Sequence, residues 1–363
     1  METLESPASV SNSPTGLADA AVRGRLLAWL QAQGLALLAS DLQVERLSGG
    51  QSNPSWLLRS GGRLWVLRAK PAPAAQLLPS AHAIEREYRL LHALQGSAVP
   101  MPQVHALCED ESVIGVAFYL MDFVPGRIFR DANMPELSAA EREACYASAN
   151  RTLAALHSVD WRALGLADFG RHEGYYTRLV RRWTQQYQAS CAEPVPAMAQ
   201  LAQWLPAHIP AGADGPAHTC ITHGDYRIEN LMFHPERPEV VAVLDWELAT
   251  LGDPMSDLAY SALAWHMPSG ILRGYADALL PGMPNEAAWR ERYCALRGLD
   301  AQAVARDWPF YLAFNLFRLA AILFGIGQRA REGVASNSSA HEIAAMAEPV
   351  AGWGWAIAQG RTP

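Results

Sequence analysis

The N-terminal third of the chain alternates short apolar runs with turn residues. Apolar side chains dominate residues 42–47, 56–59 and 64–70, and glycine-containing turns separate these runs at residues 48–53 and 60–62. Short runs that are linked by glycine turns are typical of hairpins, in which each strand pairs with the next one along the chain. The pattern therefore predicts a small antiparallel sheet.

Further elements are predicted around this sheet. Helix spacing of apolar residues over residues 17–38 predicts an amphipathic helix, whereas residues 1–16 lack periodicity and predict a flexible tail. A second helix is predicted over residues 81–94 and a strand over residues 108–115. A buried strand is predicted to begin at Val116 and to run into a Pro-Gly connector.

The remainder of the chain has the apolar spacing of helices, and Ser138 is a suitable N-cap for the first of them. The helical segments are residues 138–157, 183–205, 255–264, 287–296, 308–325 and 342–358. A small sheet-containing part followed by a large helical part predicts an α+β fold. The length of 363 residues is enough for two domains or one two-lobed enzyme.

Composition narrows the class of protein. Half of the residues are hydrophobic, and the net charge of −7 argues against a nucleic-acid partner, which requires a concentrated basic face. The odd number of five cysteines favours reduced thiols and a cytoplasmic location, and the acidic N-terminus does not resemble a signal peptide. Asn315 and Arg318 interrupt the most apolar stretch, so we expect a buried helix and no membrane partner. The oligomeric state is left open.

Residues 222–257 contain the candidate chemistry. Asp225 follows His223 and Gly224, Asn230 comes five residues later, and Asp245 ends an apolar run. One carboxylate can contact a hydroxyl, while an amide oxygen and a second carboxylate suit a hard divalent metal such as Mg²⁺. Strands at residues 231–233 and 240–244 are expected to form a hairpin that returns Asp245 to the loop.

Three motifs in this window resemble the aminoglycoside phosphotransferase and choline kinase family, which has a two-lobed protein-kinase-like fold. They read His-Gly-Asp-x-x-x-x-Asn, Asp-Trp-Glu and Gly-Asp-Pro-x-x-Asp. The resemblance implies transfer of a phosphate from ATP, with Mg²⁺, to a hydroxyl of a small-molecule acceptor. It also implies a nucleotide-binding N-terminal lobe at residues 17–124 and a catalytic, mainly helical lobe at residues 125–363.

The same resemblance assigns roles within the window. Asp225 would accept the hydroxyl proton, and Arg227 would steady the transferring phosphoryl group unless it pairs with an acid such as Glu229. The remaining residues fall into a metal group and a structural group. The metal ligands would be Asn230, Asp245 and, for a second metal, Glu247, whereas His223, Asp253 and Asp257 would support the loop.

The N-terminal lobe would supply the nucleotide site. Glycine turns let backbone N–H groups approach phosphate oxygens, and the turn in question is Ser48, Gly49, Gly50, Gln51, Ser52 and Asn53. Arg68 falls where protein kinases carry a phosphate-binding Lys, and choline kinases resemble this chain in having Arg at that position. Lys70 is the second choice for this role. Glu87 would pair with that cation. At the hinge, Met121 would line the adenine pocket, and Asp122, Phe123 and Val124 would bind adenine by main chain.

The acceptor is less defined by the sequence. The segments Gly-Gly-Gln-Ser-Asn-Pro, Leu-Leu-Pro-Ser-Ala-His and Gly-Arg-Ile-Phe resemble the kinase-like domain fused to acyl-CoA dehydrogenases. This resemblance implies phosphorylation of a hydroxyacyl-CoA or hydroxy acid, with an aminoglycoside or another small alcohol as the alternative. An inactive nucleotide-binding pseudokinase is the alternative of another class. The spacing His218-x-Cys220-x-x-His223 lacks a fourth soft ligand and does not predict a zinc site.

Overall fold

The computed structural model describes residues 16–35, 41–47, 53–71, 83–191, 193–270, 272, 274–276, 279–333 and 339–361. Apart from Gly16, the predicted tail lies outside these residues, as do five of the six residues of the predicted phosphate-binding turn: Ser48, Gly49, Gly50, Gln51 and Ser52. The chain divides into two compact units. The first comprises Met1–Gly96 with Met101–Pro125, and the second comprises Ser97–Pro100 with Gly126–Pro363.

The first unit is built on an antiparallel sheet. Its strand order is β1 (Gln43–Arg46), β2 (Ser55–Ser60), β3 (Arg63–Ala69), β5 (Phe118–Asp122) and β4 (Val104–Cys108). Gly61 and Gly62 join β2 to β3 with φ of +56° and +73°. Positive φ at both central residues is the type I′ hairpin geometry, which glycine adopts without steric cost. The three hairpin-linked strands predicted from the sequence are confirmed.

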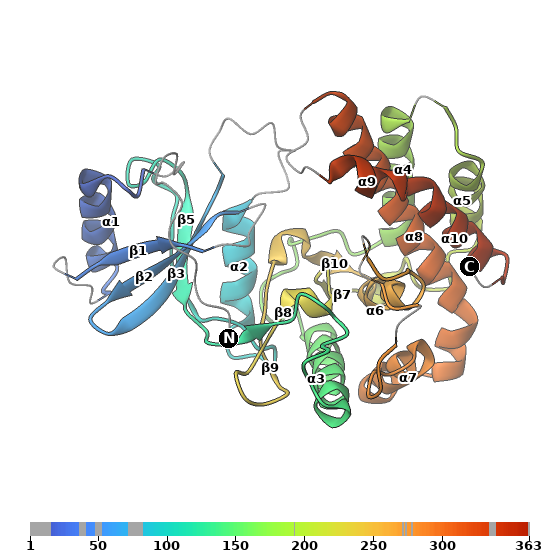
Figure 1. Ribbon diagram of the computed structural model, residues 1–363, viewed down its shortest axis with the longest axis horizontal. Helices are drawn as coiled ribbons and strands as arrows, with labels where there is room; N and C mark the ends of the chain where they lie inside the picture. The colour runs from blue at the N-terminus through green and yellow to red at the C-terminus, as the bar shows by residue number, and fades with distance from the viewer. Residues whose placement is uncertain are drawn as a thin grey trace. The chain divides into compact units, whose positions relative to one another are not determined.

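Two helices cover opposite faces of this sheet, α1 (Ala20–Ala32) and α2 (Ile84–Leu94) (Figure 1). Alternation along the strands decides which side chains meet which helix. Leu67 and Phe118 pack with α1, where the ring of Phe118 meets Trp29 edge-on at 5.1 Å. The alternate residues along each strand face α2. The polar side chains that are predicted to contact the nucleotide therefore lie on the α2 side of the sheet.

The strand predicted over residues 108–115 is wrong. β4 ends at Cys108, and the next residues form turns in which Asp110 accepts a hydrogen bond from the Ser112 N–H at 2.9 Å. Gly115 has φ of +93°, a conformation that glycine tolerates and that a regular strand does not use. Short-range side-chain bonding therefore replaces strand pairing here.

The second unit is mainly helical, with short strands and 3₁₀ turns between the helices. Its strands form two small sheets, β6-β8-β9 and β10-β7. The elements are β6 (Arg127–Ile128), α3 (Ala139–His157), α4 (Tyr175–Ser190), α5 (Pro196–Ala207), η1 (Pro216–His218), β7 (Cys220–Thr222), η2 (Ile228–Asn230), β8 (Leu231–Phe233), β9 (Val240–Val243), η3 (Trp246–Leu248), β10 (Thr250–Gly252), α6 (Pro254–Ala262), η4 (Leu263–Trp265), α7 (Glu286–Arg297), α8 (Ala301–Arg331), α9 (Ala340–Ala345) and α10 (Ala347–Ala358).

Helix α8 is the core helix of the second unit. It packs against α4, α6 and α10, which lie around it in Figure 1. Its apolar window is long enough to span a membrane, but 78% of that window is buried inside the structure. The predicted buried helix is therefore confirmed, and it is longer than the pattern indicated because Asp300 caps it, accepting from the Gln302 and Ala303 N–H groups.

Two of the helices that the sequence predicts are each divided into two helices in the structure. Residues 183–205 divide between α4 and α5, since Pro194 and Pro196 cannot continue the hydrogen-bond ladder of α4. Residues 342–358 divide between α9 and α10. The cap predicted for α3 is confirmed, because Ser138 and Glu141 form a reciprocal capping box.

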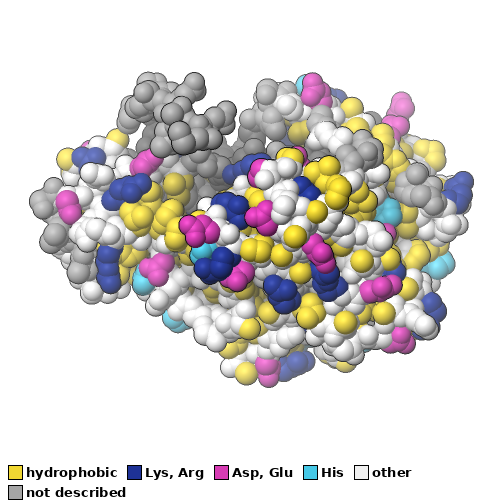
Figure 2. All heavy atoms as spheres, turned by 60° about the horizontal axis from the view of Figure 1, so that its bottom comes forward, with side chains coloured by type: hydrophobic (Ala, Val, Ile, Leu, Met, Phe, Trp, Pro, Cys, Tyr) yellow, Lys and Arg dark blue, Asp and Glu magenta, His cyan; other side chains and the backbone are white. Residues whose placement is uncertain are grey.

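Charges are mixed over the face shown in Figure 2. Lys and Arg side chains there are interspersed with Asp and Glu side chains, and apolar side chains lie between them. This face does not concentrate the positive charge that phosphate-backbone binding requires.

Candidate functional site

A hairpin in the second unit brings the two ends of the candidate motif together. Leu231 of β8 pairs with Val243 of β9, and the Leu244 N–H donates to the Asn230 carbonyl at 2.9 Å. Asp245 is the next residue, so it lies beside Asn230 although fifteen positions separate them. The hairpin predicted from the sequence is confirmed.

Asn230 fixes the Asp225 carboxylate. Its Nδ2 donates to the Asp225 carbonyl and to Asp225 Oδ2, both at 2.8 Å. The next side chain along the loop, Tyr226, is buried and donates its hydroxyl to the Ala149 carbonyl at 2.7 Å. The Asp225 side chain remains 17% exposed. The loop therefore presents a carboxylate that is oriented but accessible.

Arg227 contacts two acids. Its Nε lies 3.5 Å from Asp225 Oδ1, and its Nη1 lies 3.7 Å from Glu229 Oε1. Burial disfavours its charge, but the neighbouring carboxylates, Asp225 first among them, outweigh burial and raise the pKa of the guanidinium. The pairing with Glu229 that the sequence offered as an alternative is present, and 44% of the Arg227 side chain is exposed.

His223 supports the loop through hydrogen bonds. Its Nε2 lies 2.8 Å from the Leu244 carbonyl, and the Asp225 N–H donates to its Nδ1 at 3.2 Å. Because Nδ1 accepts one of these bonds, Nε2 is the ring nitrogen that donates to the Leu244 carbonyl. The ring is fully buried and joins the catalytic loop to the end of the hairpin.

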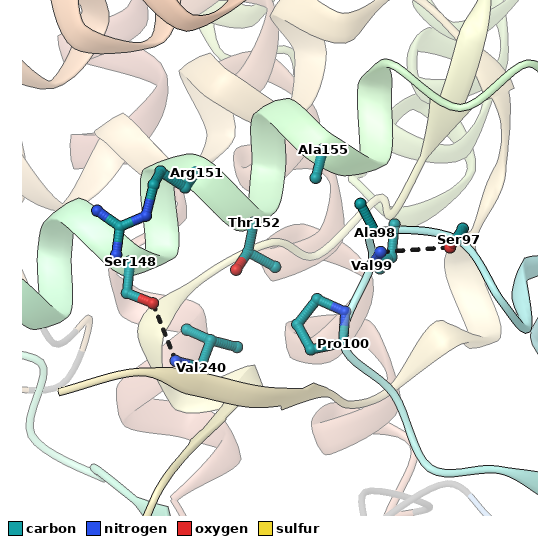
Figure 3. A pocket seen from close by; sticks show the side chains of 9 residues that line it. All are labelled: Ser97, Ala98, Val99, Pro100, Ser148, Arg151, Thr152, Ala155 and Val240. Carbon is teal, nitrogen blue, oxygen red and sulfur yellow. Dashed lines mark hydrogen bonds between the residues drawn. The ribbon is translucent and has the colours of Figure 1, made fainter. Parts of the chain in front are cut away.

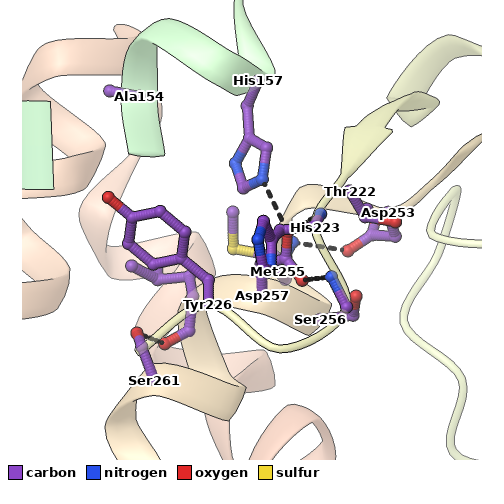
Figure 4. Close-up of polar contacts among 12 residues, drawn as sticks. Ala154, His157, Thr222, His223, Tyr226, Asp253, Met255, Ser256, Asp257 and Ser261 are labelled. Atoms are coloured by element: carbon purple, nitrogen blue, oxygen red, sulfur yellow. Dashed lines mark hydrogen bonds and ion pairs between the residues drawn. The ribbon is translucent and has the colours of Figure 1, made fainter. Parts of the chain in front are cut away.

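Asp257 accepts hydrogen bonds from the backbone of the loop (Figure 4). Its Oδ2 accepts the His223 N–H at 2.5 Å, its Oδ1 accepts the Gly224 N–H at 2.8 Å, and His157 Nε2 lies 3.3 Å from Oδ2. Burial would raise the pKa of Asp257, but the bond to His157, the nearby imidazoles and the backbone donor hold it below its usual value. A bond of 2.6 Å between His157 Nδ1 and the Tyr293 hydroxyl orients that imidazole.

Gly224 is required by its surroundings. Its φ is +86°, and a Cβ at this position would lie 2.8 Å from the Leu248 carbonyl oxygen. Only glycine fits such a close backbone approach. The tight loop between His223 and Asp225 therefore depends on this residue.

Asp253 differs from Asp257 in its protonation. It caps α6, and its Oδ1 accepts the Met255 N–H and the Tyr176 hydroxyl, both at 2.9 Å. Burial raises the pKa of Asp253 to about 7, and these two hydrogen bonds only partly offset the effect. The nearby Asp214 raises it further.

Replacing Asp253 with Asn is expected to reduce the pH dependence of stability between about pH 4 and 7. The unfolded chain loses this proton near 3.8, whereas the folded protein keeps it to about 7, so wild-type stability falls as pH rises through the window. Asn accepts the same two bonds without charge. Urea unfolding across this window should show the variant gaining stability relative to wild type as pH rises, and parallel curves would contradict the assignment.

The donor set at the hairpin fits a Mg²⁺ ion. Asn230 directs its Nδ2 at Asp225, which leaves its Oδ1 on the opposite side of the amide, and the hairpin brings the backbone of Asp245 beside Asn230. Asp245 has φ of +65°, an uncommon conformation for a non-glycine residue that often marks functional sites. Among the described residues no group of three His, Cys, Asp or Glu side chains could hold a metal. Mg²⁺ commonly needs only one or two protein ligands besides phosphate oxygens and water.

Glu247 lies two residues after Asp245, within η3. It shares this short turn with the buried Trp246, whose indole donates to the Val243 carbonyl at 2.9 Å. The turn keeps Glu247 close in sequence and space to the hairpin end. Cys220, which the sequence does not assign to a metal site, is buried, and burial raises the pKa of its thiol well above the usual value.

In the first unit, Arg68 and Glu87 form an ion pair on the α2 side of the sheet. Arg68 Nε lies 3.0 Å from Glu87 Oε1, and Glu87 also accepts from the Tyr119 hydroxyl at 3.2 Å and from Asn53 Nδ2 at 3.4 Å. Arg68 Nη1 donates to the Asn53 carbonyl at 3.4 Å. The cation is thus tied to the last residue of the glycine-containing turn.

Lys70 has a different partner. Its ammonium pairs with Glu85, two residues of α2 before the partner of Arg68. The side chains of Lys70 and Glu85 are 35% and 31% exposed, whereas those of Arg68 and Glu87 are 12% and 3% exposed. Solvent screens the exposed pair of Lys70 and Glu85 more than the buried pair of Arg68 and Glu87. Arg68 is therefore the better candidate for a phosphate contact.

At the predicted hinge, two main-chain donors already have partners. The Asp122 N–H donates to the Gln103 carbonyl at 2.8 Å, and the Phe123 N–H donates to the Leu64 carbonyl at 3.3 Å. Of the three predicted hinge N–H groups, that of Val124 has no partner within the described residues. Of these three groups, the Val124 N–H is thus the one left to bind a ligand.

The second unit also contains a pocket of about 360 Å³ that is lined by other residues than those of the predicted site (Figure 3). Its lining residues come from α3, from β9 and from the segment before β4: Ser97, Ala98, Val99, Pro100, Ser148, Arg151, Thr152, Ala155 and Val240. Ser148 Oγ accepts the Val240 N–H at 2.9 Å, which ties α3 to the hairpin. None of the predicted site residues lines this pocket, so the hydrogen-bond geometry around Asp225 is the better guide to the chemistry.

Sequence reasoning missed Arg318 as a neighbour of the loop. Its Nη2 donates to the Gly224 carbonyl at 2.7 Å from α8, ninety-four positions along the chain. Arg318 was noted only as a charge that interrupts an apolar stretch. A buried guanidinium in an apolar core helix is itself a signal, because such a charge requires partners.

Comparisons with known proteins agree with this geometry. Residues 43–308 match the model of the phosphotransferase enzyme family. Acyl-CoA dehydrogenase family member 10 of Mus musculus is 44% identical over 321 residues, which are 87% of this chain and 29% of that protein. The chain thus spans less than a third of the length of this relative.

Solved structures resemble the chain throughout. A Ralstonia eutropha protein with the provisional name aminoglycoside phosphotransferase is 45% identical, with a TM-score of 0.83 over 93% of this chain and 98% of that one. The aminoglycoside phosphotransferase APH(4)-Ia, solved with ADP and hygromycin B, is 18% identical, with a TM-score of 0.56 over 92% of this chain and 97% of that one. The two-lobed, protein-kinase-like α+β fold predicted from the sequence is confirmed.

Proposed function

Because the chain belongs to the phosphotransferase enzyme family, we propose that it transfers the γ-phosphate of ATP to a hydroxyl of a small molecule through Asp225. The observation that carries this proposal is the Asp225 carboxylate, which Asn230 orients with two bonds of 2.8 Å beside the hairpin that ends at Asp245. Phosphoryl transfer depends on positioning and charge stabilisation, which such a loop supplies.

The reaction follows from the groups around Asp225. The acceptor oxygen forms a bond to the γ-phosphorus while the bond to the bridging oxygen breaks, and ADP leaves with that oxygen. Asp225 accepts the hydroxyl proton late in the reaction. Arg227, close to Asp225 and partly exposed, contacts the oxygens of the transferring group, for which its planar fork is suited.

The nucleotide contacts come from the first unit. Arg68, held by Glu87, contacts the phosphates together with Asn53 and the turn at residues 48–52. The main chain around Val124 binds adenine, and the partly exposed Met121 lines the pocket. Asp122 and Phe123 support this segment through their own N–H bonds.

Asn230 and Asp245 would hold Mg²⁺, and Glu247 would assist a second ion. When bound, the metal would neutralise charge on the phosphate oxygens. Asn230 can offer its Oδ1 to the ion, because its Nδ2 donates to Asp225.

Replacing Asp245 with Asn is expected to weaken Mg²⁺-dependent nucleotide binding by about 10- to 100-fold, because one charged oxygen is lost from the ion. Asn tolerates the positive φ of this position, so the hairpin is preserved. Calorimetric titration of nucleotide with and without Mg²⁺ measures the effect. Equal affinity of wild type and variant in Mg²⁺ would remove Asp245 from the metal site.

The proposed acceptor is a hydroxyacyl-CoA or hydroxy acid. It rests on similarity to a relative that carries an acyl-CoA dehydrogenase name, of which this chain spans 29%. The alternative acceptor, an aminoglycoside or other small alcohol, rests on the provisional name of the Ralstonia eutropha relative. A screen of hydroxylated metabolites from both classes for phosphate gain by mass spectrometry, with ATP and with GTP, separates them.

An inactive nucleotide-binding module is the alternative of another class. It requires a defect in the catalytic set; Asp225, Asn230 and Asp245 are all present, and Arg68 in place of the protein-kinase Lys is the one feature that favours it. Nucleotide binding without transfer to any acceptor of the screen would favour it. A cytoplasmic location and the absence of nucleic-acid or membrane partners complete the proposal.

A further inference from the structure

Arg318 is a buried cation without an acidic partner. Its residue is 8% exposed, and no Asp or Glu oxygen in the described part of the chain lies within 4.0 Å of its guanidinium. Its neighbours are the Gly224 carbonyl, at 2.7 Å from Nη2, and two aromatic rings, Tyr260 at 5.2 Å and Trp183 at 5.9 Å. Aromatic faces offset only part of the cost of burying a charge.

A second buried arginine in the same unit shows how this fold satisfies a structural guanidinium. Arg142 donates to four carbonyls, those of Asn133, Met134, Leu137 and Pro281. Arg318 makes one such bond among the described residues. Its remaining donors are therefore available to a ligand, in contrast to those of Arg142.

Two further donors lie around Arg318. The indole Nε1 of Trp183 is buried and has no hydrogen-bond partner among the described residues. The phenol of Tyr260 interacts with the Asp225 carboxylate, and burial and that carboxylate raise its pKa above the usual value. These side chains come from α4, α6 and α8, which pack together next to the catalytic loop (Figure 1).

The set is rich in donors and carries positive charge. A guanidinium and an indole N–H suit oxygens that accept several hydrogen bonds, above all a carboxylate, whereas the one hydrogen of the Tyr260 phenol is directed at Asp225. The amino groups of a cationic acceptor would instead be repelled by Arg318 and Arg227. The Gly224 contact places the charge one residue from Asp225, so a bound anionic group would lie a few bonds from the reacting hydroxyl.

We propose that Arg318 and Trp183 form an acceptor subsite that binds an anionic oxygen group of the substrate, a carboxylate or a phosphate close to its hydroxyl. This inference rests on the proposed function, and it selects acidic acceptors from the classes considered there. Within that set it places free hydroxy acids ahead of neutral alcohols and aminoglycosides.

The test compares matched acceptors and variants. Hydroxy acids of increasing chain length are assayed beside their diols, their amides and the corresponding hydroxyalkyl phosphates. Wild type is compared with Arg318→Lys, Arg318→Gln, Tyr260→Phe and Trp183→Phe. Arg182→Gln is the control, because Arg182 is an exposed cation that also lies over the Trp183 ring, at 5.2 Å.

The expected result is a preference of wild type for an acidic acceptor that depends on Arg318. Arg318→Gln should lower the ratio of kcat/KM for the acidic acceptor to kcat/KM for its diol by about thirtyfold or more, whatever change the lost bond to the Gly224 carbonyl causes in both. Trp183→Phe, which removes the indole donor, should narrow the preference, whereas Tyr260→Phe should leave it. The control should keep it. Carboxylate and phosphate acceptors in parallel distinguish the two sources of the anionic group.

Several results would overturn the subsite. They are a wild type that phosphorylates the neutral analogue as well as the acid, an equal loss for both in Arg318→Gln, or a change in the KM for ATP alone. Calorimetric binding of the same acids, without nucleotide, separates this inference from the proposed function. Arg318-dependent binding without transfer supports the subsite and contradicts the kinase reaction, whereas transfer without discrimination does the reverse.

Discussion

Asp225→Asn is expected to lower kcat for phosphate transfer by about 10²- to 10⁴-fold, the usual contribution of a positioned general base. Asn cannot accept the acceptor proton, but it has nearly the same shape as Asp. It can still accept the Asn230 amide, so the loop should keep its conformation. Steady-state kinetics with an acceptor identified by the screen measures the effect, and nucleotide affinity measured in parallel should change little.

The control for this substitution is a second carboxylate with no place in the site. Glu239 is exposed and pairs with Arg237 at 2.9 Å, so Glu239→Gln should leave kcat unchanged. An Asp225→Asn enzyme that transfers phosphate at the wild-type rate would show that the proton leaves by another route. A loss of both rate and fold would be visible as a lower melting temperature.

Asp257→Ala is expected to lower the free energy of unfolding by about 3–5 kcal/mol. The substitution leaves the buried N–H groups of His223 and Gly224 without their acceptor, and it removes the partner of His157. Each unsatisfied buried group costs about 1–3 kcal/mol. Urea unfolding followed by tryptophan fluorescence gives the difference in stability.

The pH dependence of the same carboxylate has a defined sign. Its pKa in the folded protein is lowered, so the stability it contributes is present above its unfolded pKa near 3.8 and is lost as pH falls toward its folded pKa. Asp257→Ala should lack this acid-side loss. Asp253→Asn, four residues away, provides the contrast, since the pKa of Asp253 is shifted upward. An Asp257→Ala variant as stable as wild type at neutral pH would contradict the bracing role.

Local patterns determined much of the fold because their causes are local. The hairpin of β8 and β9 follows from two apolar runs and a polar turn. The capping box of α3 follows from Ser138 and Glu141, and the turn between β2 and β3 follows from two glycines. In each case the groups that stabilise the element lie within a few residues of each other. The proximity of Asp245 to Asn230 and Asp225 could also be predicted from the sequence, because the hairpin that connects them is short.

Where competing local signals met, the sequence pattern was less reliable. Helix spacing continued across Pro194 and Pro196, although proline ends the hydrogen-bond ladder there. The apolar residues before Gly115 resembled a strand, but the side chain of Asp110 bonds to the backbone and forms a turn. The apolar period alone does not contain these backbone constraints.

By itself the sequence thus determined the reaction motif, the α+β class and the family, since these depend on residue types at short spacing. Only the tertiary structure decided which distant groups complete the site. Asp257 reaches back to the His223 and Gly224 N–H groups, and Arg318 reaches the Gly224 carbonyl from α8. Packing also gave opposite pKa shifts to two acids of one motif, because burial raises the pKa of Asp253, whereas the bond to His157, the nearby imidazoles and a backbone donor outweigh burial at Asp257. The reason is physical: hydrogen-bond partners and solvation of a buried group are properties of packed neighbours, and those neighbours lie far apart along the chain.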